Sequence, residues 1–336
     1  MPTVSLVGVA HIHTPGFVKR LLARSASVKV KRVWDPNRAR ARKRAAELST
    51  QAVSSADAIW NDPEITAVVI TSETDRHAEL VAAAARTGKH MFVEKPLGLG
   101  AADALKMARA IDKAQVTFQT GYFMRGQPIN RFLREQVQRG AFGKVTRVRA
   151  SNCHAGALED WFSAEWKWMT DPKRSGCGGF GDLGTHMLDI LMWIFGDVDS
   201  VAAATAAPLK RYGASCDETG EGLLRFRSGV LGSLAAGWVD IGNPVTLAIS
   251  GTEGLAWVVD GRLYFKSKRV RGADGKEPWT DLPEALPHAF DLFFDALEGK
   301  KVPLVSAGEA AARSAVVEAF YEAARSGKWV KAARAG

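Results

Sequence analysis

The first third of the chain alternates short apolar runs with stretches that favour helices. Residues 4–7 and 67–71 are mostly apolar, whereas residues 38–48 and 101–114 have the composition and spacing of helices. Short buried strands that alternate with amphipathic helices are typical of βαβ units around a parallel sheet. We therefore predict an α/β domain of the Rossmann type, a doubly wound parallel sheet, over residues 1–122.

The pattern changes after residue 122. Helices are expected at 128–139 and 184–195, and strand-like runs follow that are separated by tight turns such as Arg227-Ser228-Gly229. Consecutive strands joined in this way favour antiparallel pairing. We predict a second, α+β domain over residues 123–336 that has a large, open, mostly antiparallel sheet and two closing helices, near 288–297 and 307–326. Its expected strands are 145–152, 198–206, 222–227, 230–238, 245–249, 255–259 and 263–266.

The net charge of +9 does not indicate nucleic-acid binding. Much of the surplus lies between Arg38 and Arg44 on one predicted helix, where a solvated face explains it, and no helix-turn-helix signature accompanies it. No stretch approaches the roughly 18 apolar residues that span a bilayer, and the N-terminus lacks a signal-peptide pattern. Cys153, Cys177 and Cys216 form neither a disulfide framework nor a Cys-x-x-Cys pair. We expect a cytoplasmic protein without nucleic-acid or membrane partners.

The first strand–helix turn partly matches the Gly-x-Gly-x-x-Gly fingerprint of dinucleotide-binding proteins. Gly8 stands at the first glycine position, but Ala10 and His13 replace the second and third. The turn still ends a strand and opens a helix, so its backbone N–H groups face a bound anion. We predict that Gly8, Ala10, His11, Ile12 and His13 hold a dinucleotide. His11 and His13 have no further metal ligand that the sequence identifies, so no metal site is expected.

Asp35 ends the second predicted strand. A carboxylate there accepts hydrogen bonds from the adenosine ribose hydroxyls and repels a 2′-phosphate, so we expect NAD to be preferred to NADP. Arg38 keeps NADP possible, because an arginine near this position accommodates the extra phosphate. The alternative role for Asp35 is a turn residue before Pro36 and Asn37.

Two further segments resemble the Gfo/Idh/MocA family of oxidoreductases, named after glucose–fructose oxidoreductase and inositol dehydrogenase. The first contains His77-Ala78-Glu79-Leu80 and runs through Gly88 to Glu94-Lys95-Pro96; the second is the Gly-rich stretch with Asp182-x-x-x-His186. The region of Pro303, Glu309 and Arg313 is also similar to the family, so the resemblance covers nearly the whole chain. It implies a Rossmann domain, an open-sheet substrate domain, NAD or NADP as cofactor, and a sugar, inositol or related polyol as substrate.

By this resemblance, Lys95 is catalytic and close to the cofactor, Asp182 orients the substrate or assists the base, and His186 exchanges the proton. Oxidation of a secondary alcohol releases a hydride to nicotinamide and a proton to a base, and imidazole suits that base. Asp182 and His186 are four residues apart at a helix start, so they share one face. The alternative roles are an N-cap for Asp182, a core histidine for His186 and a surface lysine for Lys95. Thr71, Ser72, His77, Glu94 and Lys95 complete the expected cofactor site.

We also expect a neighbouring cation and the nicotinamide ring to lower the pKa of Lys95. The family resemblance further implies a cis peptide bond between Lys95 and Pro96. Three tryptophans precede the Gly-rich stretch, and indole faces suit sugar rings, although core packing is the competing explanation. The expected substrate-binding residues are Tyr122, Arg125, Asn152, His154, Trp161, Trp166, Lys173, Asp182 and His186, with Trp168, Lys167 and Arg174 nearby.

Two other functions stay open. The family includes NAD-dependent glycosidases that act by transient oxidation, and the altered glycine turn fits a non-catalytic sugar- or dinucleotide-binding regulator. Lys95, Asp182 and His186 favour the dehydrogenase or reductase over that regulator. The small residues of the strand at 230–238 and an uncovered sheet face predict a homodimer or homotetramer.

Overall fold

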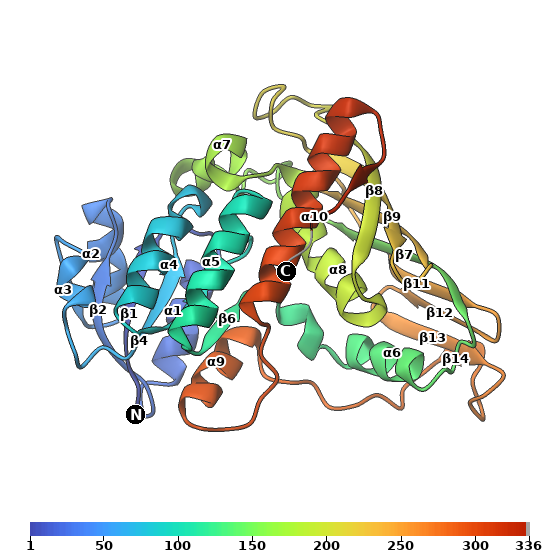
Figure 1. The fold of residues 1–336 in the computed structure, drawn as a ribbon, viewed down its shortest axis with the longest axis horizontal. Coiled ribbons are helices and arrows are strands. Elements are labelled where there is room, and N and C mark those ends of the chain that lie inside the picture. Colours follow the sequence, from blue (N-terminus) through green and yellow to red (C-terminus); the bar gives the residue numbers. More distant parts are fainter. Residues whose placement is uncertain (334–336) are drawn as a thin grey trace.

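The computed structural model describes residues 1–333 and contains two sheets (Figure 1). The first has six parallel strands in the order β3-β2-β1-β4-β5-β6. The chain reverses direction across the sheet between β1 and β4, and ligands of such sheets bind at the carboxyl ends of these strands. This confirms the predicted Rossmann fold. Its elements are β1 (Thr3–Val9), α1 (Thr14–Ala23), β2 (Lys29–Trp34), α2 (Arg38–Glu47), β3 (Gln51–Ala52), α3 (Asp57–Trp60), β4 (Ala67–Thr71), η1 (Thr74–Arg76), α4 (His77–Arg86), β5 (His90–Val93), α5 (Ala101–Ala114) and β6 (Phe118–Thr120).

The second sheet has nine strands in the order β14-β13-β12-β11-β7-β10-β9-β8-β15. It is mostly antiparallel, as predicted, but β10 pairs parallel with β7. Its strands are β7 (Val145–Cys153), β8 (Val198–Ala206), β9 (Thr219–Phe226), β10 (Leu231–Gly237), β11 (Val245–Gly251), β12 (Gly254–Val259), β13 (Arg262–Ser267), β14 (Asp274–Pro278) and β15 (Val330–Lys331). The accompanying helices are η2 (Phe123–Gly126), α6 (Pro128–Gln138), η3 (Ala164–Thr170), α7 (Pro172–Ser175), α8 (Gly179–Phe195), α9 (Ala289–Leu297) and α10 (Ala307–Ser326).

Helix α8 is buried along nearly its whole length between the two sheets. It begins at Gly179, five residues before the predicted start at Gly184, because glycines there mask the helical pattern. These glycines are required by close packing: a Cβ at Gly179 would lie 2.7 Å from the Glu218 carbonyl oxygen. The early start places Asp182 inside the helix, one turn before His186, and Gly178 rather than Asp182 is the N-cap.

The C-terminal part of the chain returns to the first sheet. Phe290, Phe293 and Phe294 of α9 belong to the same apolar core as Phe17 and Phe92 of the Rossmann domain. The start of α10 packs against α5, and its later turns lie against β8 (Figure 1). The first sheet thus ends with β6 and the second begins with β7, while α9 contributes to the core of the first. The domain boundary at residue 122 stays a prediction.

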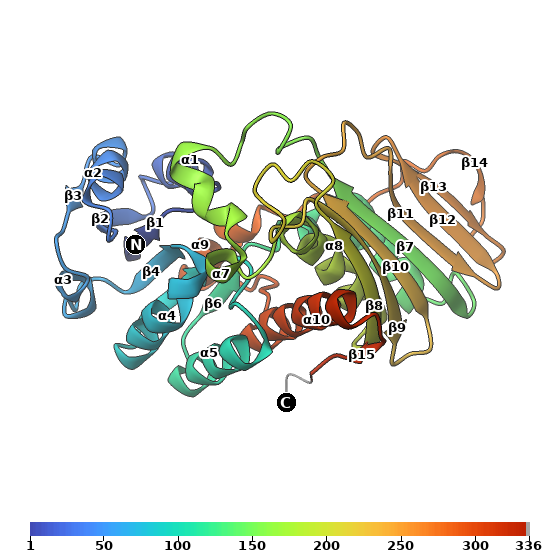
Figure 2. The same ribbon diagram turned by 90° about the horizontal axis from the view of Figure 1, so that it is seen from above.

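Figure 2 shows a segment from the second sheet that reaches over the Rossmann domain. This segment, which leads from β7 through η3 and α7 to α8, contacts η1 and α2 through ion pairs such as Arg44–Glu165 at 3.4 Å. The other face of the nine-stranded sheet exposes apolar side chains, including Leu223, Leu231 and Leu255. Among residues 1–333, no helix has the length and apolar character needed to cross a membrane.

Candidate active site

The turn after β1 is shaped by Gly8. Its φ of +75° lies in the left-handed region, and a Cβ at this position would come 2.4 Å from the Cβ of Ser72. Only glycine allows this close approach between the ends of β1 and β4. The N–H groups of Ala10 and His11 both donate to the Thr71 carbonyl at 2.9 Å, which fixes the turn against β4.

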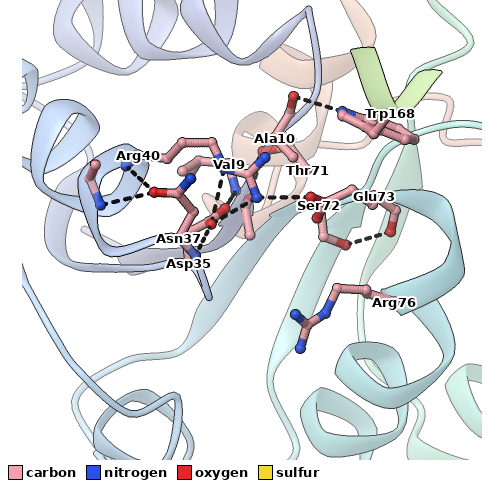
Figure 3. A network of polar contacts seen from close by, with 12 residues as sticks. Val9, Ala10, Asp35, Asn37, Arg40, Thr71, Ser72, Glu73, Arg76 and Trp168 are labelled. Carbon is pink, nitrogen blue, oxygen red and sulfur yellow. Dashed lines mark hydrogen bonds and ion pairs between the residues drawn. The ribbon is translucent and has the colours of Figure 1, made fainter. Parts of the chain in front are cut away.

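Ala10, at the second glycine position, lies beneath a tryptophan. The indole Nε1 of Trp168 donates to the Ala10 carbonyl at 3.1 Å (Figure 3), and both residues are buried. Trp161 is exposed and its ring lies 4.7 Å from that of His154, while Trp166 is half-buried. Of the three tryptophans expected to stack on a sugar ring, Trp168 therefore contacts the dinucleotide turn.

Asp35 is part of a buried ionic network (Figure 3). Its carboxylate accepts the N–H groups of Val9 at 2.8 Å and Asn37 at 2.7 Å, and it lies 2.9 Å from the Arg40 guanidinium. Arg40 also contacts Glu73 at 2.8 Å. The sequence pattern pointed to Arg38 as the arginine near Asp35, but Arg38 is exposed on α2 and Arg40 occupies that place.

Lys95 and Asp182 form a buried ion pair between the two domains. The Lys95 Nζ lies 2.7 Å from Asp182 Oδ1, and the Trp238 indole donates to Asp182 Oδ2 at 3.1 Å. Burial opposes both charges, but the partner lysine holds the pKa of Asp182 well below its usual range. Asp182 and Glu94 likewise outweigh burial and raise the pKa of Lys95. The expected lowering of the Lys95 pKa is therefore wrong for the protein without its cofactor.

His186 follows Asp182 by one helical turn and is buried. Burial, and then the charge of Lys95, lower its pKa well below 6.5, so the imidazole is neutral at pH 7. Its Nδ1 has no hydrogen-bond partner among the described residues. The ring centroid lies 5.4 Å from that of Phe123 and 6.2 Å from that of Tyr122. A neutral imidazole with a free ring nitrogen can accept a proton.

Three side chains gather at the dinucleotide turn beside Lys95. His13 Nδ1 lies 2.9 Å from Glu94 Oε1, His11 Nδ1 accepts the His13 N–H at 3.2 Å, and Glu94 Oε2 accepts the Lys95 N–H at 2.6 Å. Burial lowers the pKa of His11 to about 3. Burial opposes the charge of Glu94, but His11 and His13 hold its pKa well below the usual value. The sequence did not indicate this meeting, because His13 and Glu94 are far apart along the chain.

The other residues predicted for the site differ in their hydrogen-bond partners and in their burial. Tyr122 is buried and bonds to Thr185 at 2.9 Å, and Arg125 makes two hydrogen bonds to Asp189 and one to Glu309, so protein groups occupy their polar atoms. His77 Nδ1 contacts the Leu97 carbonyl, and the bond between Lys95 and Pro96 is cis, as predicted. Asn152 donates to the Leu183 carbonyl, and His154 is half-buried near Asp182 and Lys95. Lys167 and Lys173 are both exposed, and Arg174 pairs with Glu73 at 3.0 Å.

Three residues near the site carry no signal in the sequence. Arg40 and Trp238 belong to no local motif. His288 stacks on Phe123 with ring centroids 5.2 Å apart, and burial and Arg20 lower its pKa to about 4. No motif marks His288 either, and only the return of α9 to the first sheet brings it here.

A Rossmann sheet with a glycine-dependent turn, joined to an open-sheet domain through a buried lysine–carboxylate pair, defines a class of two-domain, NAD-binding oxidoreductases. Residues 3–122 match the family described as "Oxidoreductase family, NAD-binding Rossmann fold", and residues 130–257 match the "GFO/IDH/MocA C-terminal domain". The chain belongs to the Gfo/Idh/MocA oxidoreductase family, as the sequence motifs predicted.

Named relatives include a levoglucosan dehydrogenase of Pseudarthrobacter phenanthrenivorans, 29% identical over 58% of this chain and 56% of its own length. A 1,5-anhydro-D-fructose reductase of Ensifer adhaerens is 27% identical over 83% of both chains. A myo-inositol 2-dehydrogenase of Thermotoga maritima is 34% identical over 51% of this chain and 49% of its own. The chain thus spans only about half of two of these relatives. A solved levoglucosan dehydrogenase in complex with NADH and L-sorbose shares the fold, with a TM-score of 0.81, 22% identity and full coverage of both chains.

Proposed function

We propose that the protein is an NAD-dependent dehydrogenase or reductase that interconverts a secondary alcohol and a ketone on a sugar, inositol or related polyol. The observation that carries this proposal is the pair of Lys95 and Asp182 at 2.7 Å, with His186 one turn further along α8. These groups stand at the carboxyl end of the Rossmann sheet, where a bound dinucleotide presents its reactive ring. The names of the relatives support the substrate class.

The residues present fit a dinucleotide. Gly8 lets the ends of β1 and β4 approach closely, and the N-terminus of α1, which follows the turn, offers a favourable dipole to a phosphate. Gly8, Ala10, His11, Ile12 and His13 would hold the pyrophosphate, Asp35 the adenosine ribose, and Thr71, Ser72, Glu94 and Lys95 the nicotinamide half. NAD supplies the hydride acceptor or donor when it is bound.

The three proposed catalytic side chains have different roles in proton transfer, polarisation of the substrate oxygen and positioning. His186, whose imidazole is neutral, takes the substrate hydroxyl proton or returns it. Lys95 stays charged because Asp182 and Glu94 face it, so its ammonium polarises the same substrate oxygen. Asp182, held by Lys95 and Trp238, fixes the position of that ammonium.

The test is a screen of sugars, inositols and sugar acids with NAD⁺ or NADH, in which nicotinamide absorbance is followed. At least one polyol should support turnover that Lys95→Ala abolishes. Binding of NAD(H) and sugars without turnover of any substrate would favour the regulator instead. Product analysis on glycosides tests the alternative glycosidase function, because that reaction cycle leaves no net change in NADH but releases a free sugar.

We further propose a homodimer or homotetramer that forms through the open face of the nine-stranded sheet. Leu231 is 55% exposed and Leu223 is 52% exposed on this face, which favours coverage by a second copy. Light scattering at micromolar concentration tests it, and a monomer would contradict it. The free thiols Cys153, Cys177 and Cys216 support a reducing, cytoplasmic location.

A further inference from the structure

The turn after β1 carries two histidines, one of which stands where the dinucleotide fingerprint has a glycine. His13 stands at the third glycine position, and His11 stands two residues before it. Their ring nitrogens and a carboxylate oxygen of Glu94 all lie within 4.8 Å of one another. His11, His13 and Glu94 therefore form a compact set of donor atoms.

This set is held in place by two separate parts of the Rossmann domain, the turn after β1 and the end of β5. His11 belongs to the turn, His13 is the N-cap of α1, and Glu94 follows β5. His11 and Glu94 are almost fully buried, while the His13 side chain is 39% exposed and opens the group to small solutes. Glu94 Oε2 is fixed by the Lys95 N–H at 2.6 Å, which leaves Oε1 directed at His13. Little side-chain entropy remains to be lost when a ligand binds.

The chemistry of the donors indicates which ligand fits. Two imidazoles and one carboxylate are the protein ligands of several zinc sites that keep a fourth position open. Calcium and magnesium are poor candidates, because both prefer all-oxygen coordination.

The surrounding charges also suit a cation. The closest positive group is the Lys95 ammonium, and Asp182 neutralises it at 2.7 Å. Glu94 then remains as a buried carboxylate whose only close ionic partner among the described residues is His13. A divalent ion bound here would compensate this negative charge more fully than one imidazole does.

We propose that His11, His13 and Glu94 form a binding site for a divalent transition-metal ion of the zinc type. The site lies where the dinucleotide turn meets the catalytic lysine. It does not require the proposed dehydrogenase activity, since the donor set exists in the chain without cofactor or substrate.

The experiment uses the full chain without a histidine tag, freed of metal by a chelator. Calorimetric titration with ZnCl₂ should show one tight site per chain, and CoCl₂ should produce the visible absorption of a low-coordinate cobalt site with nitrogen ligands. His13→Gly restores the fingerprint residue, and Glu94→Gln keeps the side-chain volume. Each should weaken zinc binding by more than about tenfold, with circular dichroism confirming the fold.

His154→Ala is the matched control, because it removes another half-buried histidine near Lys95 without touching the cluster. Its zinc affinity should equal that of the unaltered chain. Absence of a tight site in the unaltered chain, or zinc binding that survives both His13→Gly and Glu94→Gln, overturns the proposal. Calorimetry with NAD⁺ on the metal-free protein separates this result from the proposed function, which stands or fails on nicotinamide binding and turnover.

Discussion

The ammonium of Lys95 and the carboxylate of Asp182 come from opposite domains and meet at 2.7 Å in a buried position. Asp182→Asn would remove the carboxylate that the buried ammonium contacts, although Glu94 would still face it. We expect a loss of about 3–5 kcal/mol in the free energy of unfolding, together with a lower pKa of Lys95, because burial would then act with less opposition. Urea unfolding and the pH profile of turnover measure the two effects. The double variant Lys95→Met/Asp182→Leu should recover much of the stability while remaining inactive; equal instability of both variants would contradict this account.

His186→Ala removes the proposed proton acceptor while leaving the dinucleotide turn intact. General acid–base help is worth about 10²–10⁴-fold, so kcat should fall by that factor with little change in NAD(H) affinity. Steady-state kinetics and fluorescence titration with NADH are the measurements. Near-full turnover of His186→Ala would assign the proton transfer to Lys95 instead.

Arg40, rather than Arg38, should tune the choice between NAD and NADP. Its guanidinium lies 2.9 Å from Asp35 and offsets the charge that would repel a 2′-phosphate. The unaltered protein should prefer NAD(H), and Arg40→Ala should weaken NADP(H) binding more than NAD(H) binding, which sharpens the preference. Arg38→Ala is the matched control, since Arg38 is exposed and should leave the ratio unchanged. Tighter NADP(H) binding by the unaltered protein would refute the expectation.

Gly8→Ala should disrupt the turn after β1. The substitution combines a φ of +75° with a Cβ contact of 2.4 Å to Ser72. Gly88→Ala isolates the backbone contribution, because Gly88 has a φ of +66° and a Cβ added there would meet no atom within 4 Å. Gly88→Ala should cost about 1 kcal/mol, and Gly8→Ala clearly more, with loss of NADH binding. Equal unfolding midpoints for the two variants would show that the Ser72 contact relaxes freely.

Acid should destabilise the fold through buried neutral histidines. The pKa of His288 is lowered to about 4 and that of His186 lies well below 6.5, whereas both titrate near 6.5 in the unfolded chain. Below about pH 6.5 the unfolded state therefore binds more protons, and stability falls as pH falls. The limiting slope is about 1.4 kcal/mol per pH unit for each histidine.

Urea unfolding at pH 7, 6 and 5 measures this slope. His288→Asn retains an N-cap acceptor for α9 and should reduce the slope between pH 6 and pH 5. An unchanged slope in that variant would remove His288 from the explanation.

Local sequence patterns were sufficient to predict most helices and strands of the fold. The strand at 67–71 and the helices at 101–114 and 307–326 have the bounds that the sequence predicted. The start of α8 was placed five residues late, because glycines lower helix propensity when read locally. In the folded protein the same glycines let α8 approach β9 and β10 closely.

The sequence by itself determined the two sheets, the family and the expectation that Lys95, Asp182 and His186 come together. The sheets follow from short-range periodicity, whereas the family and the expected meeting of these three residues follow from the resemblance that the sequence motifs carry. Only the tertiary structure decided that Arg40 pairs with Asp35, that His13 meets Glu94, and that His288 returns to stack on Phe123. Such pairs join side chains from different elements, and their contact depends on helix rotation, strand order and burial. Local sequence patterns constrain none of these three quantities tightly enough to name a partner.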